Sequence, residues 1–457
     1  MINQETIIAL ATPNGLGAIS VIRISGKEAI KITEKLFKGK NNKILSKQNS
    51  HTVHLGHLLK NGHELDEVLI SLFKEPHSYT GEDTVEISCH GSTYIQKEII
   101  DLFIDQGIRV ANPGEFTLRA FINGKMDLNQ AEAVADLIAS ENEGSHKLAM
   151  QQMKSGFSND LKKLRFELLH FSSMIELELD FSQEDVEFAE RDEFKKLTNK
   201  IKSELKVLIN SFQSGNVLKN GISVAIAGKP NAGKSSLLNT LLNEDKAIVS
   251  EIPGTTRDSI EDSLIIDGIN FRFIDTAGLR ETEDIIESKG IERTKEKIKK
   301  AKILLYLFDV NDTNIDEIKS KTDSFKRKDL SILLVRNKID LKIENKNLLN
   351  NLKNSEIIEI SATDSESVSK LKKRLVNEVD ILNPYTDVII SNSRHYEALI
   401  KALKAIEEVN KGLKENISGD LLSVDIRRSI EYLAEITGEI TNDDVLGNIF
   451  ANFCIGK

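Results

Sequence analysis

The sequence predicts a multidomain protein that combines an α+β domain, an all-α domain and an α/β domain. Its 457 residues exceed the usual size of one domain and suggest about three. A glycine-rich phosphate-binding motif follows an apolar run near the middle of the chain, which indicates an α/β block there. The segments on both sides of this block carry the apolar spacing of helices, whereas residues 1–120 do not.

The N-terminal part, residues 1–120, is expected to form the α+β domain. Short apolar runs separated by turn residues predict strands, and one longer run predicts a helix. The strands are expected at 6–12, 18–24, 68–72 and 84–88, and the helix at 92–106. The first two strands are joined by a tight turn that contains Pro13 and Gly17, so we expect them to pair.

A helical domain is expected from residues 121–215 together with 383–457. Apolar side chains recur at helical spacing at Leu161, Leu164, Leu168, Phe171 and Ile175. Residues 393–447 return to the same pattern, which favours one helical domain with the block 216–382 inserted into it. Two separate helical domains are the alternative. Turn-forming residues at 213–216 and 383–386 are expected to link the inserted block to the helices.

The phosphate-binding motif runs from Gly228 to Ser235 and reads GKPNAGKS. An apolar strand-like run precedes it and a helix-like run follows, which is the context such a loop needs. Backbone N–H groups of the loop can surround phosphate oxygens, and the start of the helix adds a positive dipole end. Lys234 is expected to reach the β- and γ-phosphates and Ser235 to ligate Mg²⁺. The other contacting residues of the loop are expected to be Asn231, Ala232, Gly233 and Ser236.

Three further motifs, each after an apolar run, predict that the bound nucleotide is GTP. Asp340 of the Asn337-Lys338-Ile-Asp340 motif can accept hydrogen bonds from two guanine donors, and adenine would leave it unpaired. Asn337 is expected to tie this loop to the phosphate loop, and the stem of Lys338 to cover the base. The N–H of Ala362, after Ser361, is expected to donate to guanine O6. The motif Asp275, Thr276, Ala277 and Gly278 is expected near the metal and the γ-phosphate.

The hydrolytic apparatus departs from a common arrangement. Leu279 stands where many GTPases carry the glutamine that orients water. The amide oxygen of Asn231 could hold a monovalent cation beside the phosphates, or Asn231 could only shape the loop. A switch segment with Thr256 as a second Mg²⁺ ligand is expected to complete the site. Its residues are Ser250, Glu251, Ile252, Pro253, Gly254, Thr255 and Thr256.

Composition excludes some classes of protein and leaves others. The formal charge of −10 argues against an overall basic nucleic-acid binder, although a local basic patch remains possible. Cys89 and Cys454 lie far apart, which indicates a reducing compartment rather than a disulfide scaffold. The sequence has no signal peptide and no long apolar run, so we expect a cytoplasmic protein without a membrane-spanning helix.

Motifs outside the nucleotide site are more specific than these patterns. They are residues 112–125 (NPGEFTLRAFINGK), 126–136 (MDLNQAEAVAD), 254–258 (GTTRD) and 453–457 (FCIGK). With the four nucleotide motifs, which resemble those of TrmE–Era-type GTPases, they cover the chain in order. The chain resembles the MnmE (TrmE) family of tRNA-modification GTPases.

The resemblance implies a fold and an activity. It implies a tetrahydrofolate-binding-like N-terminal domain that also forms the homodimer, and a Ras-like GTPase domain activated by K⁺. Members add carboxymethylaminomethyl or aminomethyl groups to the wobble uridine of certain tRNAs. They work with the flavoprotein MnmG (GidA) in a heterotetramer or larger complex, and take the one-carbon unit from 5-formyltetrahydrofolate or a related reduced folate.

The resemblance also assigns roles to matching residues. It implies folate contacts at Arg23, Glu86, Lys125 and Lys457, and K⁺ ligands at Asn231, Ser250, Ile252 and Thr255. The implied K⁺ ligands favour a role of Asn231 as a cation ligand over a role in loop shape alone. Glu287 matches the residue that orients the attacking water. Cys454, in the tail beside Lys457, is either a small buried hydrophobe or a reactive thiol with a direct role.

Plainer readings exist for several of these residues. Arg23 and Glu86 alternate with apolar neighbours and could simply face solvent, and Lys125 could be an ordinary turn residue. Glu287 lies in a charged run that favours a solvated face. The competing function is a ribosome-assembly or signalling GTPase that acts only as a nucleotide-dependent binding switch. That class usually carries an RNA-binding domain after the GTPase block, and no such pattern is visible here.

Overall fold

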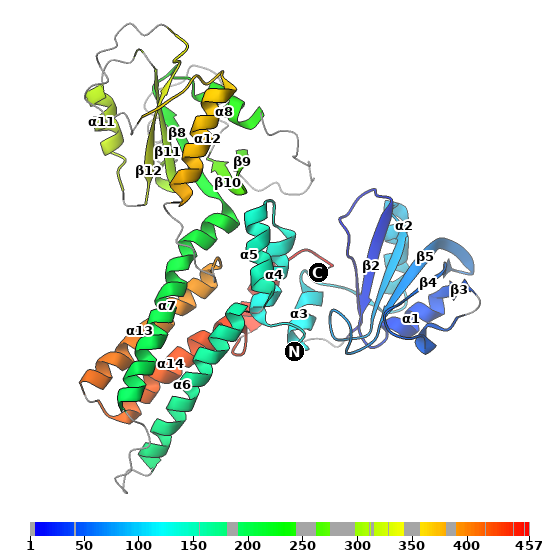
Figure 1. Cartoon of the computed structure of the whole chain (residues 1–457). Helices are drawn as coiled ribbons and strands as arrows, with labels where there is room; N and C mark the ends of the chain where they lie inside the picture. Colours follow the sequence, from blue (N-terminus) through cyan, green and yellow to red (C-terminus); the bar gives the residue numbers. More distant parts are fainter. Residues whose placement is uncertain are drawn as a thin grey trace. The chain divides into compact units, whose positions relative to one another are not determined.

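The computed structural model describes most of the chain (Figure 1). The described residues are 5–40, 43–154, 156–180, 191–243, 262–274, 298–309, 311, 315–327, 329–341, 357–380, 390–415, 417–441, 443–451 and 453–456. They form two compact units. The first comprises 1–139, 150–201 and 401–457, and the second comprises 140–149 and 202–400.

The first unit contains a seven-stranded sheet with the order β3-β4-β5-β6-β2-β1-β7. All neighbouring strands are antiparallel except β1 and β7. The strands are β1 (Ile7–Leu10), β2 (Ile19–Ser25), β3 (Phe37–Gly39), β4 (Thr52–Lys60), β5 (His63–Phe73), β6 (Thr84–His90) and β7 (Arg109–Val110). The pairing of β1 with β2 confirms the hairpin expected from the sequence.

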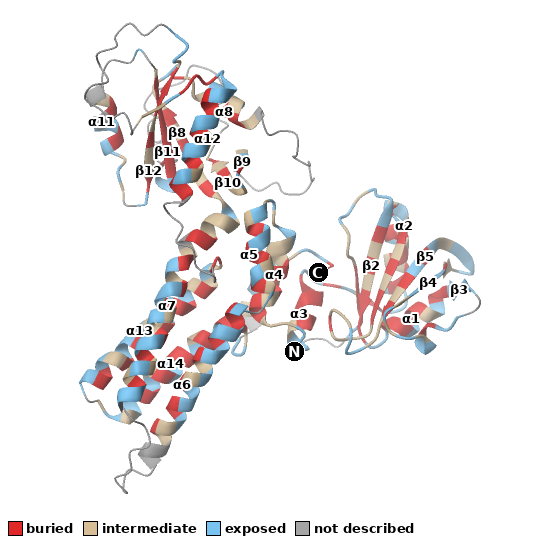
Figure 2. Cartoon of the chain, viewed as in Figure 1, coloured by how far each residue is buried: buried red, intermediate tan, exposed pale blue. Residues whose placement is uncertain are grey.

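Helices cover one face of this sheet. Alternate residues of the strands, such as Ile22, Ile70 and Ile87, are fully buried against α1 (Ala29–Leu36) and α2 (Thr93–Ile104). Because side chains alternate along a strand, the intervening residues point to the opposite face. Along β4 and β5 that face remains largely uncovered in the part of the chain described, and these strands alternate between buried and exposed positions (Figure 2).

The rest of the first unit is helical, as the apolar spacing predicted. Leu161, Leu164, Leu168, Phe171 and Ile175 are all buried along helix α6. Helix α6 packs against α14, and the ring of Phe171 stacks on that of Phe194 in α7 with centroids 3.7 Å apart. The helices are α3 (Glu115–Ile122), α4 (Leu128–Ile138), α5 (Glu143–Met153), α6 (Gly156–Asp180), α7 (Arg191–Asn220), α13 (Ser393–Lys414), α14 (Gly419–Thr437) and α15 (Asp443–Phe450). Of these, α5, α7 and α13 also contribute residues to the second unit.

The second unit contains a six-stranded sheet with the order β13-β12-β11-β8-β10-β9. All pairs are parallel except β9 with β10. The elements are β8 (Ile222–Gly228), α8 (Lys234–Asn243), β9 (Asp262–Ile266), β10 (Ile269–Phe273), β11 (Ile303–Asp309), α11 (Ile315–Asp323), β12 (Ser331–Asn337), β13 (Ile357–Glu359) and α12 (Ser365–Asp380). Helices α8 and α12 pack on one face and α11 on the other. Strand β11 is therefore buried on both sides, which explains its continuous apolar run.

Some elements differ from the sequence-based expectation. Residues 213–216, expected as a linker, continue helix α7 to Asn220. Ser and Gly favour turns, but Ser214 is buried here and the neighbouring Ser211 hydroxyl accepts from the N–H of Ile390 at 3.1 Å. The short strands β3 and β7, helix α1 and strand β4 were not expected. Residues 383–386 lie outside the described residues. No helix in the described ranges is both long and apolar enough to cross a membrane.

Candidate functional site

The nucleotide motifs meet at one edge of the parallel sheet. The phosphate loop follows β8, Asp309 ends β11, Asn337 ends β12, and Ser361 follows β13. Carboxyl ends of parallel strands lie on the same edge, and ligands bind where the strand order reverses. Here the chain passes from β8 to β10 on one side and returns to β11 on the other.

Two glycines of the phosphate loop allow the backbone to approach its neighbours closely. At Gly228, φ is +152° and an added Cβ would lie 2.1 Å from the carbonyl oxygen of Leu307. At Gly233, φ is +91° and an added Cβ would lie 2.1 Å from Nδ2 of Asn337. Asn231 between them adopts φ +62°, a left-handed conformation that asparagine tolerates better than most residues. The loop therefore has the shape of a phosphate cradle that only glycine permits at these points.

Lys234 lies across the mouth of this loop. Its ammonium donates to the carbonyl oxygens of Gly228 and Lys229, at 3.1 and 2.8 Å. Burial lowers the pKa of Lys234. Ser235 and Ser236 follow at the exposed start of α8. The lysine is thus held within the loop, where a phosphate could replace the carbonyl oxygens as its partner.

Asn337 joins the base-recognition motifs to the phosphate loop, as the sequence predicted. Its side chain is buried, donates to the carbonyl of Ala232 at 2.8 Å and accepts from the N–H of Ala362 at 2.8 Å. The N–H of Ala362 is expected to donate to guanine O6. It already donates to the Asn337 side chain, so a bound guanine would share this N–H with Asn337. Asp340 is exposed at the same edge.

Asp309 is a site residue that sequence reasoning missed. Its carboxylate pairs with the ammonium of Lys338 at 2.8 Å, while Lys338 adopts φ +66°. Burial alone would raise the pKa of Asp309, but hydrogen bonds from Asn311 and Lys338 outweigh it, and the pKa lies below its usual value. The pair fixes the lysine whose stem is expected to cover the base. An acidic residue at the carboxyl end of a buried strand was the available signal.

A second site lies on the sheet of the first unit, where Arg23 and Glu86 form an ion pair. These residues face each other across β2 and β6, and Nη2 of Arg23 lies 2.8 Å from a carboxylate oxygen of Glu86. The guanidinium lies over the rings of Tyr79 and Phe116, with centroids at 5.1 and 5.7 Å. Both charged side chains remain partly accessible, at 12% and 26%. Phe116 belongs to the motif at 112–125, but sequence patterns gave no sign that it or Tyr79 would lie beside Arg23.

The C-terminal tail reaches the same site. Nη1 of Arg23 donates to the carbonyl of Gly456 at 3.5 Å. Phe450 is buried, and its ring lies near that of Phe453 with centroids 5.1 Å apart. The carbonyl of Cys454 accepts from the N–H of Gly114 at 3.4 Å. The tail is therefore held against the loop before α3.

The motif around α3 supports this arrangement through buried charges. Arg119 pairs with Glu115 at 2.9 Å and with Glu82 at 3.0 Å, and Arg109 pairs with Glu115 at 2.7 Å. Burial alone would raise the pKa of Glu115, but hydrogen bonds from Arg109, the Asn112 N–H and Arg119 lower it overall. These contacts fix the helix on which the tail packs, which accounts for the charged residues of the NPGEFTLR motif.

The remaining expected residues separate into three groups. Lys125 does not contact Arg23 or Glu86; its ammonium donates to the carbonyl of Pro76 at 2.9 Å, on the segment that leads to Tyr79. The two cysteines differ: burial, followed by the Asp66 charge, raises the pKa of Cys89 to about 11, whereas Cys454 is exposed. The expected residues outside the described ranges are Ser250, Glu251, Ile252, Pro253, Gly254, Thr255, Thr256, Asp275, Thr276, Ala277, Gly278, Glu287 and Lys457.

Comparisons with known proteins agree with this reading. Residues 6–125 match the family described as "GTP-binding protein TrmE N-terminus", and residues 128–454 match the "MnmE helical domain". A protein of Flavobacterium johnsoniae named "tRNA modification GTPase MnmE" is 56% identical and covers 100% of both chains. Proteins of the same name from Christiangramia forsetii and Bacteroides thetaiotaomicron are 54% and 53% identical. The match to the first covers 99% of this chain and 99% of that protein, and the match to the second covers 100% of each. The chain therefore belongs to the MnmE family and is a tRNA-modification GTPase that binds and hydrolyses GTP.

Proposed function

We propose that this GTPase uses a reduced folate as one-carbon donor and K⁺ as activating cation to modify the wobble uridine of tRNA together with MnmG. The product would be an aminomethyl or carboxymethylaminomethyl uridine. The observation that carries the folate part is the contact of the tail with Arg23, which is itself paired with Glu86. We infer three functional parts, at 1–120, at 121–215 with 383–457, and at 216–382, acting in the cytoplasm.

The residues around Arg23 fit a reduced folate. The Glu86 carboxylate can accept from ring N–H donors, in the way proposed for Asp340 and guanine. Arg23 retains N–H donors beyond those used by Glu86 and Gly456, because a guanidinium carries five. Tyr79 and Phe116 supply aromatic faces. Lys457 directly follows Gly456 in the sequence. A bound folate would supply the one-carbon unit, and Cys454 is the thiol we assign to the same site.

We expect 5-formyltetrahydrofolate to bind the full chain, and Arg23→Gln to weaken binding by about tenfold or more, because charged hydrogen-bond donors are lost. Glu86→Gln should have a similar effect. Arg428→Gln, which removes an exposed arginine of α14, is the matched control and should bind normally. Isothermal titration calorimetry measures all four proteins. Equal affinity in the Arg23 variant and the control would contradict the folate assignment.

The phosphate loop fits a cation-assisted hydrolysis. We assign Mg²⁺ to Ser235 and Thr256, and K⁺ to Asn231 with Ser250, Ile252 and Thr255. Bound K⁺ would supply positive charge beside the β- and γ-phosphates, where Leu279 leaves no water-orienting amide. Glu287 is assigned to orient the water.

GTP hydrolysis is expected to be faster in KCl than in NaCl of equal ionic strength, by about tenfold or more. Asn231→Gly should remove this preference while GTP still binds. Glycine tolerates the left-handed backbone at φ +62° and removes the amide side chain, so the test separates the ligand from the loop shape. Steady-state rates and nucleotide affinity are measured in both salts. Equal rates of the unsubstituted protein in the two salts would rule out this role of K⁺.

The uncovered sheet face is the surface that we assign to the homodimer. Val53, Leu55 and Leu69 lie on this face and are 61%, 38% and 43% exposed. Neighbouring apolar side chains at this exposure favour association with a complementary surface. A symmetric contact of two such faces would bring the Arg23 sites of both protomers to the same interface, because Arg23 lies on the same face.

A further inference from the structure

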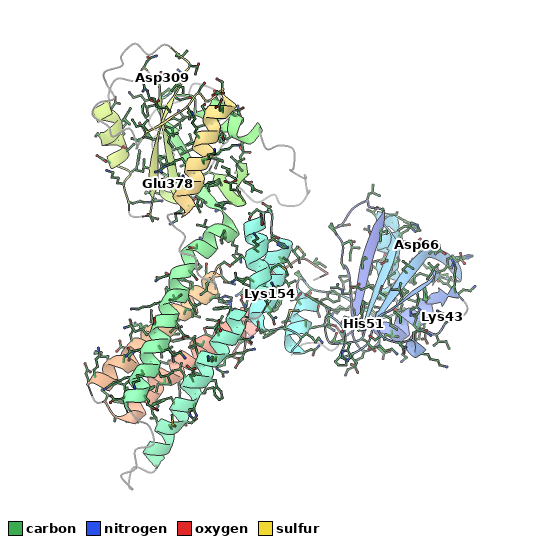
Figure 3. The ribbon with its side chains drawn as sticks, in the orientation of Figure 1. Lys43, His51, Asp66, Lys154, Asp309 and Glu378 are labelled. Carbon is green, nitrogen blue, oxygen red and sulfur yellow. The ribbon has the colours of Figure 1, made fainter. Side chains whose placement is uncertain are left out.

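One surface of the N-terminal sheet domain is strongly basic, although the chain as a whole carries a formal charge of −10. Residues 27–47 contain seven lysines and two glutamates, which gives this segment a formal charge of +5. All seven lysines are exposed, and Lys38 lies on the sheet face away from α1. We call the other six the basic surface: Lys27, Lys31, Lys35, Lys40, Lys43 and Lys47. Figure 3 marks Lys43 at the edge of the domain that carries α1 and β3.

Local contacts bring these lysines together. Lys31 and Lys35 are one turn apart on the outer face of α1. The N–H of Ser46 donates to a carboxylate oxygen of Glu34 at 2.7 Å, which fastens the short helix η2 (Leu45–Lys47) to α1. Lys74 adds another ammonium, which donates to the carbonyl of Ser46 at 2.9 Å. The positive groups of α1 and η2 therefore form one continuous surface.

The acidic residues of the segment do not neutralise this charge. Glu28 pairs with Lys31 at 3.1 Å, and Glu34 is engaged by Ser46. Within the described ranges, no carboxylate forms an ion pair with Lys35, Lys38, Lys40, Lys43 or Lys47. Like charges one helical turn apart destabilise a helix, so the fold retains these lysines at a cost. The charge of Lys43 also acts on a buried neighbour. The pKa of His54 is lowered mainly by its burial and then by the nearby charge of Lys43.

We propose that the basic surface binds the phosphate backbone of tRNA. Lysine ammonium groups bind phosphate as point charges without reading the bases, and such contacts position a nucleic acid. Ile44 is the large apolar side chain exposed among these lysines, at 41%, and no aromatic side chain of residues 27–47 is exposed for base stacking. The contacts are therefore to the backbone. This inference rests on the tRNA-modifying function of the family and not on the folate or K⁺ assignments.

The packing of α1 favours RNA over an anionic membrane as the partner. A helix that binds a membrane surface inserts its apolar face into the lipid. The apolar residues of α1 are instead buried against the sheet, including Ala29, Ile30 and Leu36. Only the charged face is available. A folded RNA offers phosphates without requiring an apolar contact, so it matches this surface better.

The position of the basic surface also leaves both other sites of the domain free. Helix α1 packs on the helix-covered face of the sheet, whereas Arg23, Glu86 and the exposed aliphatic residues are on the opposite face. Folate binding and dimerisation through that opposite face would not cover the lysines of α1 and η2. The basic surface can therefore hold one part of a tRNA while another part reaches the modification site.

The test compares two triple variants of the full chain by fluorescence anisotropy with labelled tRNA. K35Q/K43Q/K47Q removes three charges from the basic surface, and K404Q/K411Q/K414Q removes three exposed charges from α13. At about 0.1 M salt, we expect the first variant to bind tRNA about tenfold or more weakly, and the second to bind normally. The slope of log affinity against log salt should fall by about 2 to 3 in the first variant only.

Several results would overturn the proposal. The first is an equal loss of tRNA affinity in both variants, or no loss in the K35Q/K43Q/K47Q variant. The second is absence of tRNA binding by the unsubstituted protein. The third is a K35Q/K43Q/K47Q variant that binds tRNA normally but binds vesicles of phosphatidylserine and phosphatidylcholine more weakly. Circular dichroism and GTPase rates should be unchanged in both variants, which excludes unfolding as the cause. Binding of 5-formyltetrahydrofolate should also be unchanged. A failure of the folate assignment would therefore appear in a different measurement from a failure of the basic surface.

Discussion

Replacing Gly456 with alanine is expected to abolish tRNA modification and to leave GTP hydrolysis within about twofold of the unsubstituted rate, because the tail supplies none of the residues assigned to the GTP site. Gly456 is buried with φ +97°, and an added Cβ would lie 2.1 Å from the carbonyl oxygen of Leu10. That oxygen belongs to the backbone of β1 and cannot turn away as a flexible side chain would. The tail must then leave its place beside Arg23, and Cys454 moves with it.

Gly447→Ala is the matched control for this experiment. Gly447 lies in α15 of the same C-terminal segment, and an added Cβ there meets nothing within 4 Å. Alanine also favours a helix more than glycine does, so this variant should modify tRNA normally. Nucleoside analysis of tRNA from cells that carry each variant measures the outcome. Normal wobble-uridine modification by Gly456→Ala would show that the position of the tail is irrelevant. Cys454→Ser then tests the thiol separately, since it removes thiolate character while nearly keeping size.

Asp340→Asn is expected to shift base preference from guanine to xanthine by about 10³-fold or more, since a mispaired polar group at a recognition site is costly. The amide can donate to the additional carbonyl of xanthine, whereas its pairing with the two donors of guanine is lost. Asp340 follows Lys338 at the edge of the sheet where the phosphate loop and the Ser361 loop also lie. Competition between GTP and XTP for the bound state measures the shift.

Asp309→Asn is the matched control, because it removes a carboxylate from the same site without touching the predicted base contact. It breaks the ion pair with Lys338, so we expect weaker binding of GTP and XTP by similar factors. A change of base preference in the Asp309 variant, or full GTP selectivity in the Asp340 variant, would show that the roles are misassigned.

The sequence was informative where a motif and its neighbouring strand occur together. The link from Asn337 to the phosphate loop was predicted because each residue followed an apolar run at the end of a parallel strand, and the structure confirms it. The apolar positions of α6 were equally clear, since a helical repeat reports burial directly. Both signals are local, so one sequence is enough to detect them.

The parts that were missed depend on contacts between distant segments. Tyr79 and Phe116 lie against Arg23 only because a loop and α3 fold over the sheet, and no periodicity records that contact. Asp309 required a partner, Lys338, that lies 29 positions later in the sequence. The expected linker at 213–216 failed because burial of Ser214 overrode the local preference for a turn.

The contact between Arg23 and Gly456 joins residues separated by 433 positions. A ribosome adds about 5 to 20 residues per second, so the arginine emerges roughly 20 to 90 seconds before its partner. During that interval the sheet can fold, but Arg23 does not yet have the C-terminal tail beside it. The GTPase block is synthesised in between. A nascent chain therefore has all the segments assigned to GTP hydrolysis before it has the tail that we propose for the folate site, and translation arrested before residue 456 would yield the first without the second.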